Sequence, residues 1–194
     1  MQLAVIVEGI AVSLLASLTR GDIDVAICSP VVDDLAPGIC QKHLLRDRIT
    51  VVAYKDHPFL RVPRPTLAVL TPDAGGMPSN LERERQTLER ALLAAGLPPP
   101  RVAVETTSSP MVAQLLDGEQ LLAYLPLIAL ELDSAVRDLR SVPVEIPWRE
   151  RDLCVFWRDA STTLPAMTTF LECVGSAAGS LDLQDSIGTA ASAG

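Results

Sequence analysis

The sequence lacks the motifs of common enzyme classes and the basic clusters of nucleic-acid-binding proteins. It has no G-x-S-x-G, no P-loop and no G-x-G-x-x-G. Its only histidines are His43 and His57, and the sequence shows no nucleophile or acid that would form a catalytic site with either of them. Lysines and arginines are scattered, and the formal net charge of −8 opposes attraction of a polyanion through counterion release. These absences argue against an enzyme and against direct DNA binding by this chain.

The sequence also lacks a long hydrophobic run. Residues 1–18 are rich in apolar side chains, but they have no basic start and Glu8 interrupts the run, so a folded segment is favoured over a signal peptide. The apolar residues 121–132 are too few to cross a bilayer. We therefore expect a soluble, cytoplasmic protein with no membrane partner. Its 194 residues, 48% of them hydrophobic, can bury a sizeable core.

The cysteines are few and widely spaced. Cys28, Cys154 and Cys173 sit in apolar periodic segments, which favours buried free thiols in a reducing compartment over disulfides. Cys40 and His43 have a C-x-x-H spacing, but no second close pair of zinc ligands follows. No metal site and no cofactor are expected.

Residues 8–28 form the most informative segment. Four apolar residues between Ala11 and Leu18 recur at i, i+3, i+4 and i+7, which predicts one face of a helix, and Gly21 follows where a helix would be capped. The apolar run at 25–27 predicts a strand buried on both faces. A helix joined to such a strand by a short acidic loop is half of a βαβ crossover, so we expect a parallel sheet.

Further elements follow from periodicity and from helix-breaking residues. Strands are expected at residues 49–54, 67–70, 101–105, 121–125 and 153–157. Helices are expected at 79–95 with a Ser79/Glu82 capping box, at 109–118 with Ser109 as N-cap, at 126–136, and from Pro165 to about 175.

Three segments, taken in order, resemble a known family. They are the helix followed by GDIDVAI at 21–27, LLRDRITVVAYKDHP at 44–58 and GEQLLAYLP at 118–126. Over roughly residues 3–175 the chain closely resembles the effector-binding domain of LysR-type transcriptional regulators. The resemblance implies an α/β fold of two Rossmann-like lobes joined by hinge strands, the type II periplasmic-binding-protein architecture, incomplete at the N-terminus.

This architecture divides the chain into lobes. Residues 1–55 are expected to form the N-terminal part of the first lobe, residues 56–150 the second lobe, and residues 151–175 the return strand and helix of the first lobe. Residues 176–194 are rich in Gly, Ala and Ser and are expected to form a flexible tail. Strands near residues 50–57 and 150–157 would cross between the lobes and act as a hinge.

The family places a helix-turn-helix domain, a linker helix and a further strand–helix unit before this segment. None of these precedes Met1, so we expect DNA contact only through a helix-turn-helix domain absent from this chain. A parallel sheet without an inner strand leaves backbone groups unpaired, and the family's domain normally dimerises through its first lobe. A homodimer or higher oligomer is therefore expected.

A small organic effector is expected between the lobes. Thr106, Thr107 and Ser108 precede a helix whose free N–H groups and dipole favour a carboxylate. Arg48 and Tyr54 flank the expected hinge strand and can supply a charge partner and a hydrogen bond. Ordinary helix capping and a solvated strand end explain the same residues without a ligand.

The opposite side of the expected cleft is apolar. At the start of the first helix, where the family often has a hydroxyl residue facing the effector, this chain has Ile10 and Ala11. The sequence thus predicts the ligand-sensing and dimerisation domain of a LysR-type regulator with a small, anionic organic effector. The alternative is a solute-binding protein or a small α/β enzyme of similar architecture, but the signal peptide or catalytic constellation that it needs is missing.

Overall fold

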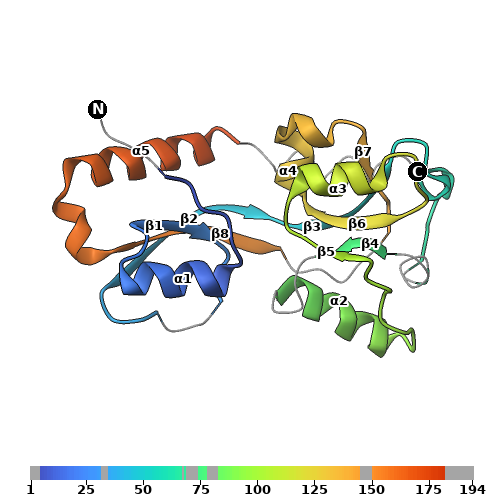
Figure 1. Cartoon of the computed structure of the whole chain (residues 1–194), viewed down its shortest axis with the longest axis horizontal. Helices are drawn as coiled ribbons and strands as arrows, with labels where there is room; N and C mark the ends of the chain where they lie inside the picture. The colour runs from blue at the N-terminus through green and yellow to red at the C-terminus, as the bar shows by residue number, and fades with distance from the viewer. Residues whose placement is uncertain are drawn as a thin grey trace. The chain divides into compact units, whose positions relative to one another are not determined.

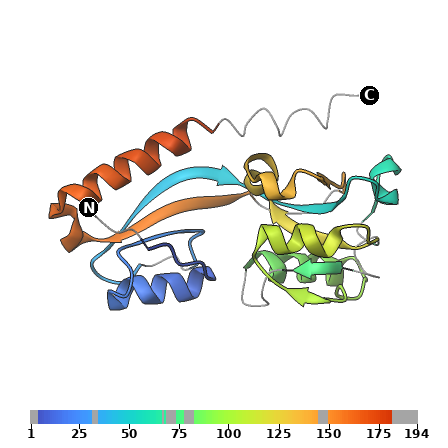
Figure 2. The same cartoon turned by 45° about the horizontal axis from the view of Figure 1, so that its top comes forward.

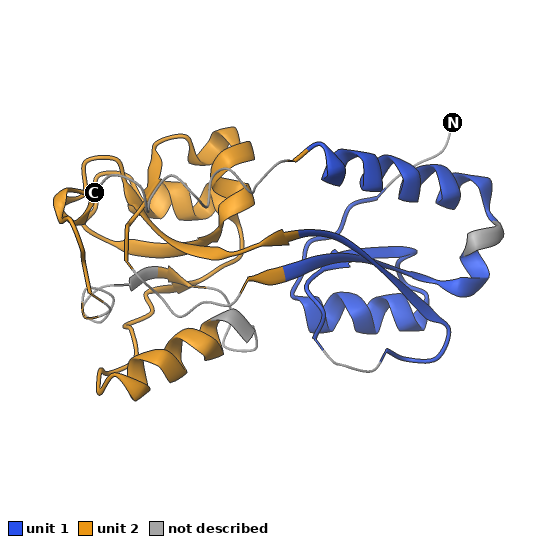
Figure 3. Ribbon diagram, turned by 180° about the vertical axis from the view of Figure 1, so that it is seen from behind, with its two compact units in different colours: residues 1–45, 152–180 blue, residues 46–151, 181–194 orange. Residues whose placement is uncertain are grey.

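The structure is a computed structural model that describes residues 5–31, 35–66, 68, 74–77, 83–144 and 150–181. The chain forms two compact units, shown in Figure 3. Unit 1 consists of Met1–Leu45 and Asp152–Ser180, and unit 2 consists of Arg46–Arg151 and Leu181–Gly194. Unit 1 is thus built from two segments that are distant in sequence.

The first predicted helix is present as α1, Ala11–Arg20. Its apolar face packs in the core of unit 1, with Leu18 completely buried. Gly21 adopts a left-handed backbone with φ of 84°, and its N–H bonds to the Leu18 carbonyl while the Asp22 N–H bonds to the Ser17 carbonyl. This is a Schellman termination, and the glycine is there because it tolerates positive φ without strain.

The sheet of unit 1 has three strands in the order β1-β8-β2. They are β1 (Val25–Cys28), β8 (Arg151–Arg158) and β2 (Ile39–Asp47). Figures 1 and 2 show β2 and β8 side by side, and the boundary between the two units crosses both strands.

The prediction that β1 joins a parallel sheet is wrong for the described residues. β1 pairs antiparallel with β8, so that Val25 lies opposite Trp157 and Cys28 opposite Cys154. A helix makes a parallel crossover only when the strand before it joins the same sheet. Residues 5–10, which precede α1, form no strand, and the neighbour of β1 is the C-terminal return strand instead.

The expectation that β1 is buried on both faces is also wrong. Ile27 is 41% exposed, whereas its neighbours Ala26 and Cys28 are buried. β1 lies at one end of the described sheet, and alternate residues face the core that α1 covers.

The sheet of unit 2 has five strands in the order β5-β4-β6-β3-β7. They are β5 (Val104–Glu105), β4 (Ala74–Met77), β6 (Leu122–Pro126), β3 (Ile49–Tyr54) and β7 (Leu139–Ser141). β4 runs parallel to β5 and β6, whereas β3 runs antiparallel to β6 and β7. The strand predicted at 49–54 is therefore present, but it belongs to unit 2. For this reason the first segment of unit 1 ends at Leu45 instead of near residue 55.

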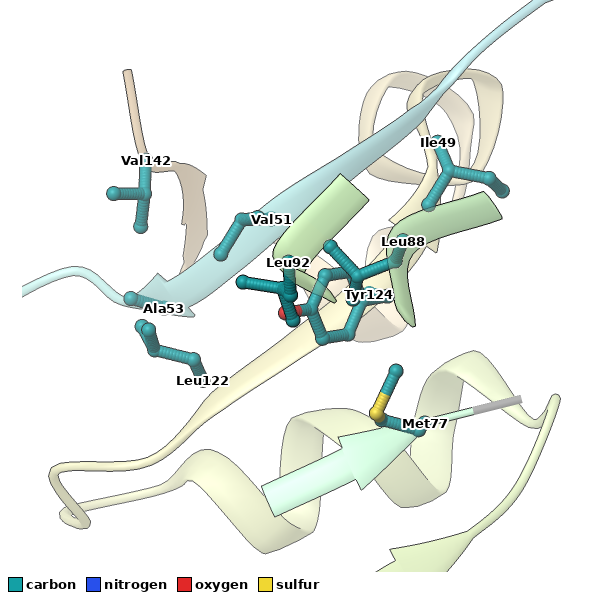
Figure 4. Close-up of a cluster of buried hydrophobic side chains, with 9 residues drawn as sticks. All are labelled: Ile49, Val51, Ala53, Met77, Leu88, Leu92, Leu122, Tyr124 and Val142. Carbon is teal, nitrogen blue, oxygen red and sulfur yellow. The ribbon is translucent and has the colours of Figure 1, made fainter. Parts of the chain in front are cut away.

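Helices cover both faces of this sheet. Leu88 and Leu92 of α2 (Arg83–Ala94) pack against Val51 and Tyr124 on one face, as Figure 4 shows. On the other face, a second cluster is formed by α3 (Ser109–Leu116) with alternate strand residues; its buried members are Val52, Val112, Leu116, Ala123, Leu125, Val136 and Leu139. Unit 2 is therefore a helix–sheet–helix sandwich with two apolar cores.

The remaining helices depart from expectation in detail. The helix expected at 126–136 is interrupted after α4 (Leu127–Leu132), because the Asp133 carboxylate accepts the Ala135 N–H and starts the 3₁₀ turn η3 (Ser134–Val136). Further 3₁₀ turns among the described residues include η1 (Pro58–Arg61) and η4 (Asp159–Thr163).

The C-terminal helix α5 runs from Pro165 to Gly179, beyond the expected end near residue 175. Met167 is buried as expected, but Cys173 is exposed, so its expected burial is wrong. The strand expected at 101–105 shortens to β5. The strand expected at 67–70 lies largely outside the described residues, as do the Ser79/Glu82 capping box and residues 182–194.

Candidate functional site

The N-terminus of α3 follows the end of β5. The Thr106 N–H donates to the Met77 carbonyl at 2.8 Å, which continues the β4–β5 pairing. The Thr106 hydroxyl then accepts the Ser108 N–H at 3.1 Å, which turns the chain into the helix. The helix begins at Ser109, and its N-cap is Ser108 rather than the predicted Ser109. The predicted cap is one residue too late because Pro110 occupies the second helical position instead of the first.

Only some of the hydroxyl groups at this terminus make hydrogen bonds within the helix start. The Ser108 side chain makes no capping hydrogen bond, although its carbonyl accepts the Val112 N–H at 3.0 Å. Thr107 is exposed, and Thr106 and Ser108 are half-buried. The first turn of a helix also has N–H groups without intrahelical acceptors. This arrangement suits an acceptor-rich, negatively charged group.

Arg48 lies at the same edge of the unit 2 sheet as this terminus. β4, β5 and β6 run in parallel, so Met77, Glu105 and Pro126 end at one edge. β3 is antiparallel to β6 and pairs Ile49 with Pro126, which brings the preceding Arg48 to that edge. The Arg48 carbonyl accepts the Leu127 N–H at 2.8 Å, at the start of α4. The carboxyl edge of parallel strands is where α/β proteins commonly bind ligands.

Tyr54 lies at the opposite edge. Its hydroxyl is hydrogen-bonded to Asp117, the C-cap residue of α3, and this bond, helped by burial, raises the pKa of Tyr54. Asp117 and Ser108 flank α3 at opposite ends and are about 14 Å apart along the helix axis. The structure therefore does not bring Tyr54 together with Thr107 and Ser108.

Ile10 and Ala11 belong to unit 1, whereas the other five candidates belong to unit 2. Ile10 is the N-cap of α1 in extended conformation, and its carbonyl accepts the Leu14 N–H at 3.0 Å. Ala11 packs against the core of unit 1. Neither side chain offers a polar group to a ligand.

One charged pair near the carboxyl edge was not found from the sequence. The Asp47 carboxylate is fully buried and pairs with Arg151, with Nη2 to Oδ2 at 2.8 Å, and its Oδ1 accepts the Ile128 N–H at 3.3 Å. Asp47 lies two residues from Leu45 and two from Ile49, so strand alternation places it on the same face as these apolar residues, and this spacing could have indicated its burial. All three residues are buried in the structure.

The C-x-x-H pair does not form a shared site. The Cys40 thiol donates to Asp159 Oδ1 at 3.6 Å, while His43 Nε2 lies 3.1 Å from Asp152 Oδ1. Within the described part of the chain, no cluster of three His, Cys, Asp or Glu residues could hold a metal ion. The described helices include none that is both long and apolar enough to span a membrane.

Comparison with known families identifies the class of this protein. Residues 5–179 match the family described as the LysR substrate binding domain. The chain therefore belongs to this family, whose members are the effector-sensing domains of LysR-type transcriptional regulators. This confirms the resemblance of the three sequence segments, and the family is one of regulator domains rather than of enzymes.

Individual relatives agree with this assignment. The chain is similar to the HTH-type transcriptional regulator GalR of Pseudomonas putida, with 25% identity over 174 residues that cover 89% of this chain and 44% of the relative. The chain thus spans less than half the length of that protein.

Two solved structures confirm the predicted two-lobed α/β fold. The regulatory domain of CcmR from Synechocystis PCC6803, in complex with 2-PG, has a TM-score of 0.68 and 17% identity, and the match covers 87% of this chain and 80% of that one. A LysR family transcriptional regulator from Pseudomonas aeruginosa has a TM-score of 0.65 and 18% identity, covering 88% of this chain and 59% of that one.

Proposed function

We propose that this chain senses a small organic carboxylate for a LysR-type transcriptional regulator, and that the carboxylate binds at the N-terminus of α3. The observation that carries the proposal is that the hydroxyl of the N-cap residue makes no capping hydrogen bond. Thr106 accepts the Ser108 N–H, while the Ser108 hydroxyl makes no capping bond. The N-cap side chain is therefore free to donate to a ligand.

The first turn of α3 supplies further donors. The N–H groups of Ser109 and Met111 precede the first intrahelical bond, which Val112 makes to Ser108. The helix dipole adds partial positive charge at this end. A carboxylate can accept hydrogen bonds from these N–H groups and from the exposed hydroxyl of Thr107.

Arg48 is the candidate cationic partner because it lies at the same edge of the sheet. β3 is three strand positions from β5, so Arg48 is roughly 14 Å along the edge from Thr106, and we expect it to contact a distal acidic group of a longer effector. Tyr54 is left out of the proposed site because it lies at the opposite edge beside Asp117. The proposal does not depend on Ile10 or Ala11.

Binding of mono- and dicarboxylates, measured by thermal shift and then by calorimetry, tests the site. We expect the double variant Thr107→Ala/Ser108→Ala to bind the best carboxylate about tenfold to a hundredfold more weakly, because two hydrogen bonds of about 1 kcal/mol each or more are lost. Tyr54→Phe is the matched control, since it also removes one hydroxyl but at the other edge, and it should keep the affinity.

Equal affinity of the double variant and the parent would show that the carboxylate binds elsewhere. A larger loss in Tyr54→Phe than in the double variant would move the site to the opposite edge. If no carboxylate stabilises the parent chain, the proposed ligand class is wrong.

We also propose that the chain works as a homodimer or higher oligomer, with DNA contacted by a helix-turn-helix domain of the regulator. Val5, Ile6 and Val7 are large apolar residues that are 75%, 91% and 57% exposed, which favours self-association. The net charge of −8 opposes contact with DNA by this chain. Light scattering that gives a monomer at micromolar concentration would contradict the first statement, and salt-sensitive retention of duplex DNA would contradict the second.

A further inference from the structure

Cys28 and Cys154 lie directly opposite each other on the antiparallel strands β1 and β8. Residues that face each other in such a pair have Cα atoms about 4.5 or 5.5 Å apart, depending on whether the pair is hydrogen-bonded. Both values fall in the interval of roughly 4.4 to 6.8 Å that disulfides require. The backbone therefore already has the spacing of a cross-strand disulfide.

The two side chains also point to the same face of the sheet. Both belong to the core of unit 1, together with Leu18, Ala26 and Phe156. Opposite residues of an antiparallel pair project on one side, so the two sulfur atoms face the same cluster. Both cysteines are reduced, and the structure does not join them in a disulfide.

Cys40 and Cys173 are placed differently. Cys40 lies near the start of β2 and donates to Asp159, and Cys173 lies on the exposed surface of α5. Neither belongs to the β1–β8 pairing that sets Cys28 opposite Cys154. They can therefore be replaced without touching the opposed pair.

We propose that Cys28 and Cys154 form a redox-sensitive pair that is converted to a cross-strand disulfide by a two-electron oxidant such as a peroxide. The bond would join the edge strand β1, and α1 before it, to β8. This inference rests on strand register alone and is independent of the proposed ligand site.

The chemistry proceeds in two displacements. Cys28 is 8% exposed and Cys154 is 1% exposed, so the oxidant reaches Cys28 first. The Cys28 sulfur attacks one peroxide oxygen, the O–O bond breaks, and a sulfenic acid and one water form. The Cys154 sulfur then attacks the Cys28 sulfur, the S–O bond breaks, and the disulfide and a second water form. Two thiols are oxidised by two electrons in total, and the peroxide is reduced to two waters.

The surroundings of Cys154 suit the second step. Burial raises the pKa of Cys154, which disfavours direct attack on an oxidant from solution. Gln41 Nε2 lies 3.2 Å from the Cys154 sulfur and donates to it, which stabilises the thiolate once the nearby sulfenic acid has formed.

The experiment uses the full chain carrying Cys40→Ser and Cys173→Ser, so that only the opposed pair remains. The folded protein is treated with hydrogen peroxide, residual thiols are alkylated under denaturing conditions, and peptides are mapped by mass. We expect a linked peptide pair containing Cys28 and Cys154 with the loss of two hydrogens. We also expect faster migration on a non-reducing gel, because residues 29–153 become a closed loop, and a higher unfolding temperature that dithiothreitol reverses.

The matched control adds Cys28→Ser to the same background and should give neither the linked peptide nor the gel shift. If that variant does not fold, the parent background still decides the question. Formation of the disulfide only in denaturant, or alkylation of both thiols after peroxide treatment of folded protein, would overturn the proposal. A linked pair that lowers the unfolding temperature would also overturn it, since the native spacing would then not suit the bond.

Discussion

Arg151 donates two hydrogen bonds to a single oxygen of Asp47, from Nε at 3.1 Å and from Nη2 at 2.8 Å. Asp47 is the last residue of β2 and Arg151 is the first residue of β8. The other oxygen of Asp47 accepts the Ile128 N–H of α4. One buried carboxylate therefore ties the ends of two crossing strands to the start of a helix in unit 2.

The substitution Asp47→Asn is expected to lower the free energy of unfolding by about 3 kcal/mol, because it removes the buried carboxylate charge that pairs with the half-buried Arg151 guanidinium. Urea unfolding followed by circular dichroism measures this loss. The matched control is Asp22→Asn, which breaks an exposed pair with Arg20 and should cost about 0.5 kcal/mol or less. Equal losses in the two variants would contradict the structural role of Asp47.

Stability is expected to fall as the pH drops below about 6.5, the ordinary pKa of histidine. His57 is 6% exposed, and its Nδ1 accepts the Phe59 N–H at 3.1 Å. Burial lowers the pKa of His57 in the folded state, so the unfolded chain takes up the proton first. The contribution of His57 is thus complete above the unfolded pKa and is lost as the pH falls towards the lower folded pKa.

Chemical unfolding between pH 7.5 and 5 tests this pH dependence. His57→Asn should remove most of the slope, because asparagine can still accept the Phe59 N–H without titrating. The exposed His43 is the reference, and His43→Asn should leave the slope attributable to His57 in place. The hypothesis fails if His57→Asn keeps the parent slope.

Arg158 is expected to stabilise the C-terminal end of α1. Its Nη1 donates to the carbonyls of Leu18 at 2.9 Å and Ile23 at 2.6 Å, and its Nη2 pairs with Asp24 at 2.9 Å. Arg158→Met should lower the free energy of unfolding by about 2 kcal/mol, since charged hydrogen bonds to carbonyls are lost.

Thermal and urea unfolding of Arg158→Met are compared with those of Arg101→Met, which changes an exposed arginine in unit 2. The latter should change the free energy of unfolding by about 0.5 kcal/mol or less. A destabilisation in Arg101→Met as large as that in Arg158→Met would argue against a specific contribution of these three bonds.

Gly21→Ala is expected to destabilise the chain by roughly 1 kcal/mol, because the left-handed backbone with φ of 84° disfavours a Cβ atom. The added Cβ would meet the Arg158 side chain only at 4.0 Å, so the loss comes from the backbone and not from a clash. Gly179→Ala is the control; this residue ends α5 and has nothing within 4 Å of its Cβ position, so helix propensity should make it neutral or slightly stabilising. Differential scanning calorimetry of both variants measures the contrast.

Several features could be predicted from the sequence because they depend on neighbours along the chain. The helix α1 with its glycine termination follows from apolar spacing and from the conformational freedom of Gly21. The bounds of β3, Ile49–Tyr54, follow from a β-branched run ended by a turn. The order of three short motifs was enough to predict the family.

Part of the candidate site could be predicted in the same way. The hydroxyls of Thr106 to Ser108 lie where a helix begins, and helix starts are encoded locally by small polar residues and proline. The predicted N-cap was wrong by one residue, because the Thr106 hydroxyl turns the chain at Ser108 and Pro110 takes the second helical position instead of the first.

The tertiary structure alone decided which segments meet. The antiparallel pairing of β1 with β8, the position of Tyr54 beside Asp117, and the pairing of Asp47 with Arg151 each join residues that are far apart in sequence. Such contacts form only when the chain closes long loops, and the balance of many burial and pairing energies selects among the possible partners. Local periodicity determines that a strand or a charge exists, whereas sheet order and register determine its partner and hence the edge at which a ligand can bind.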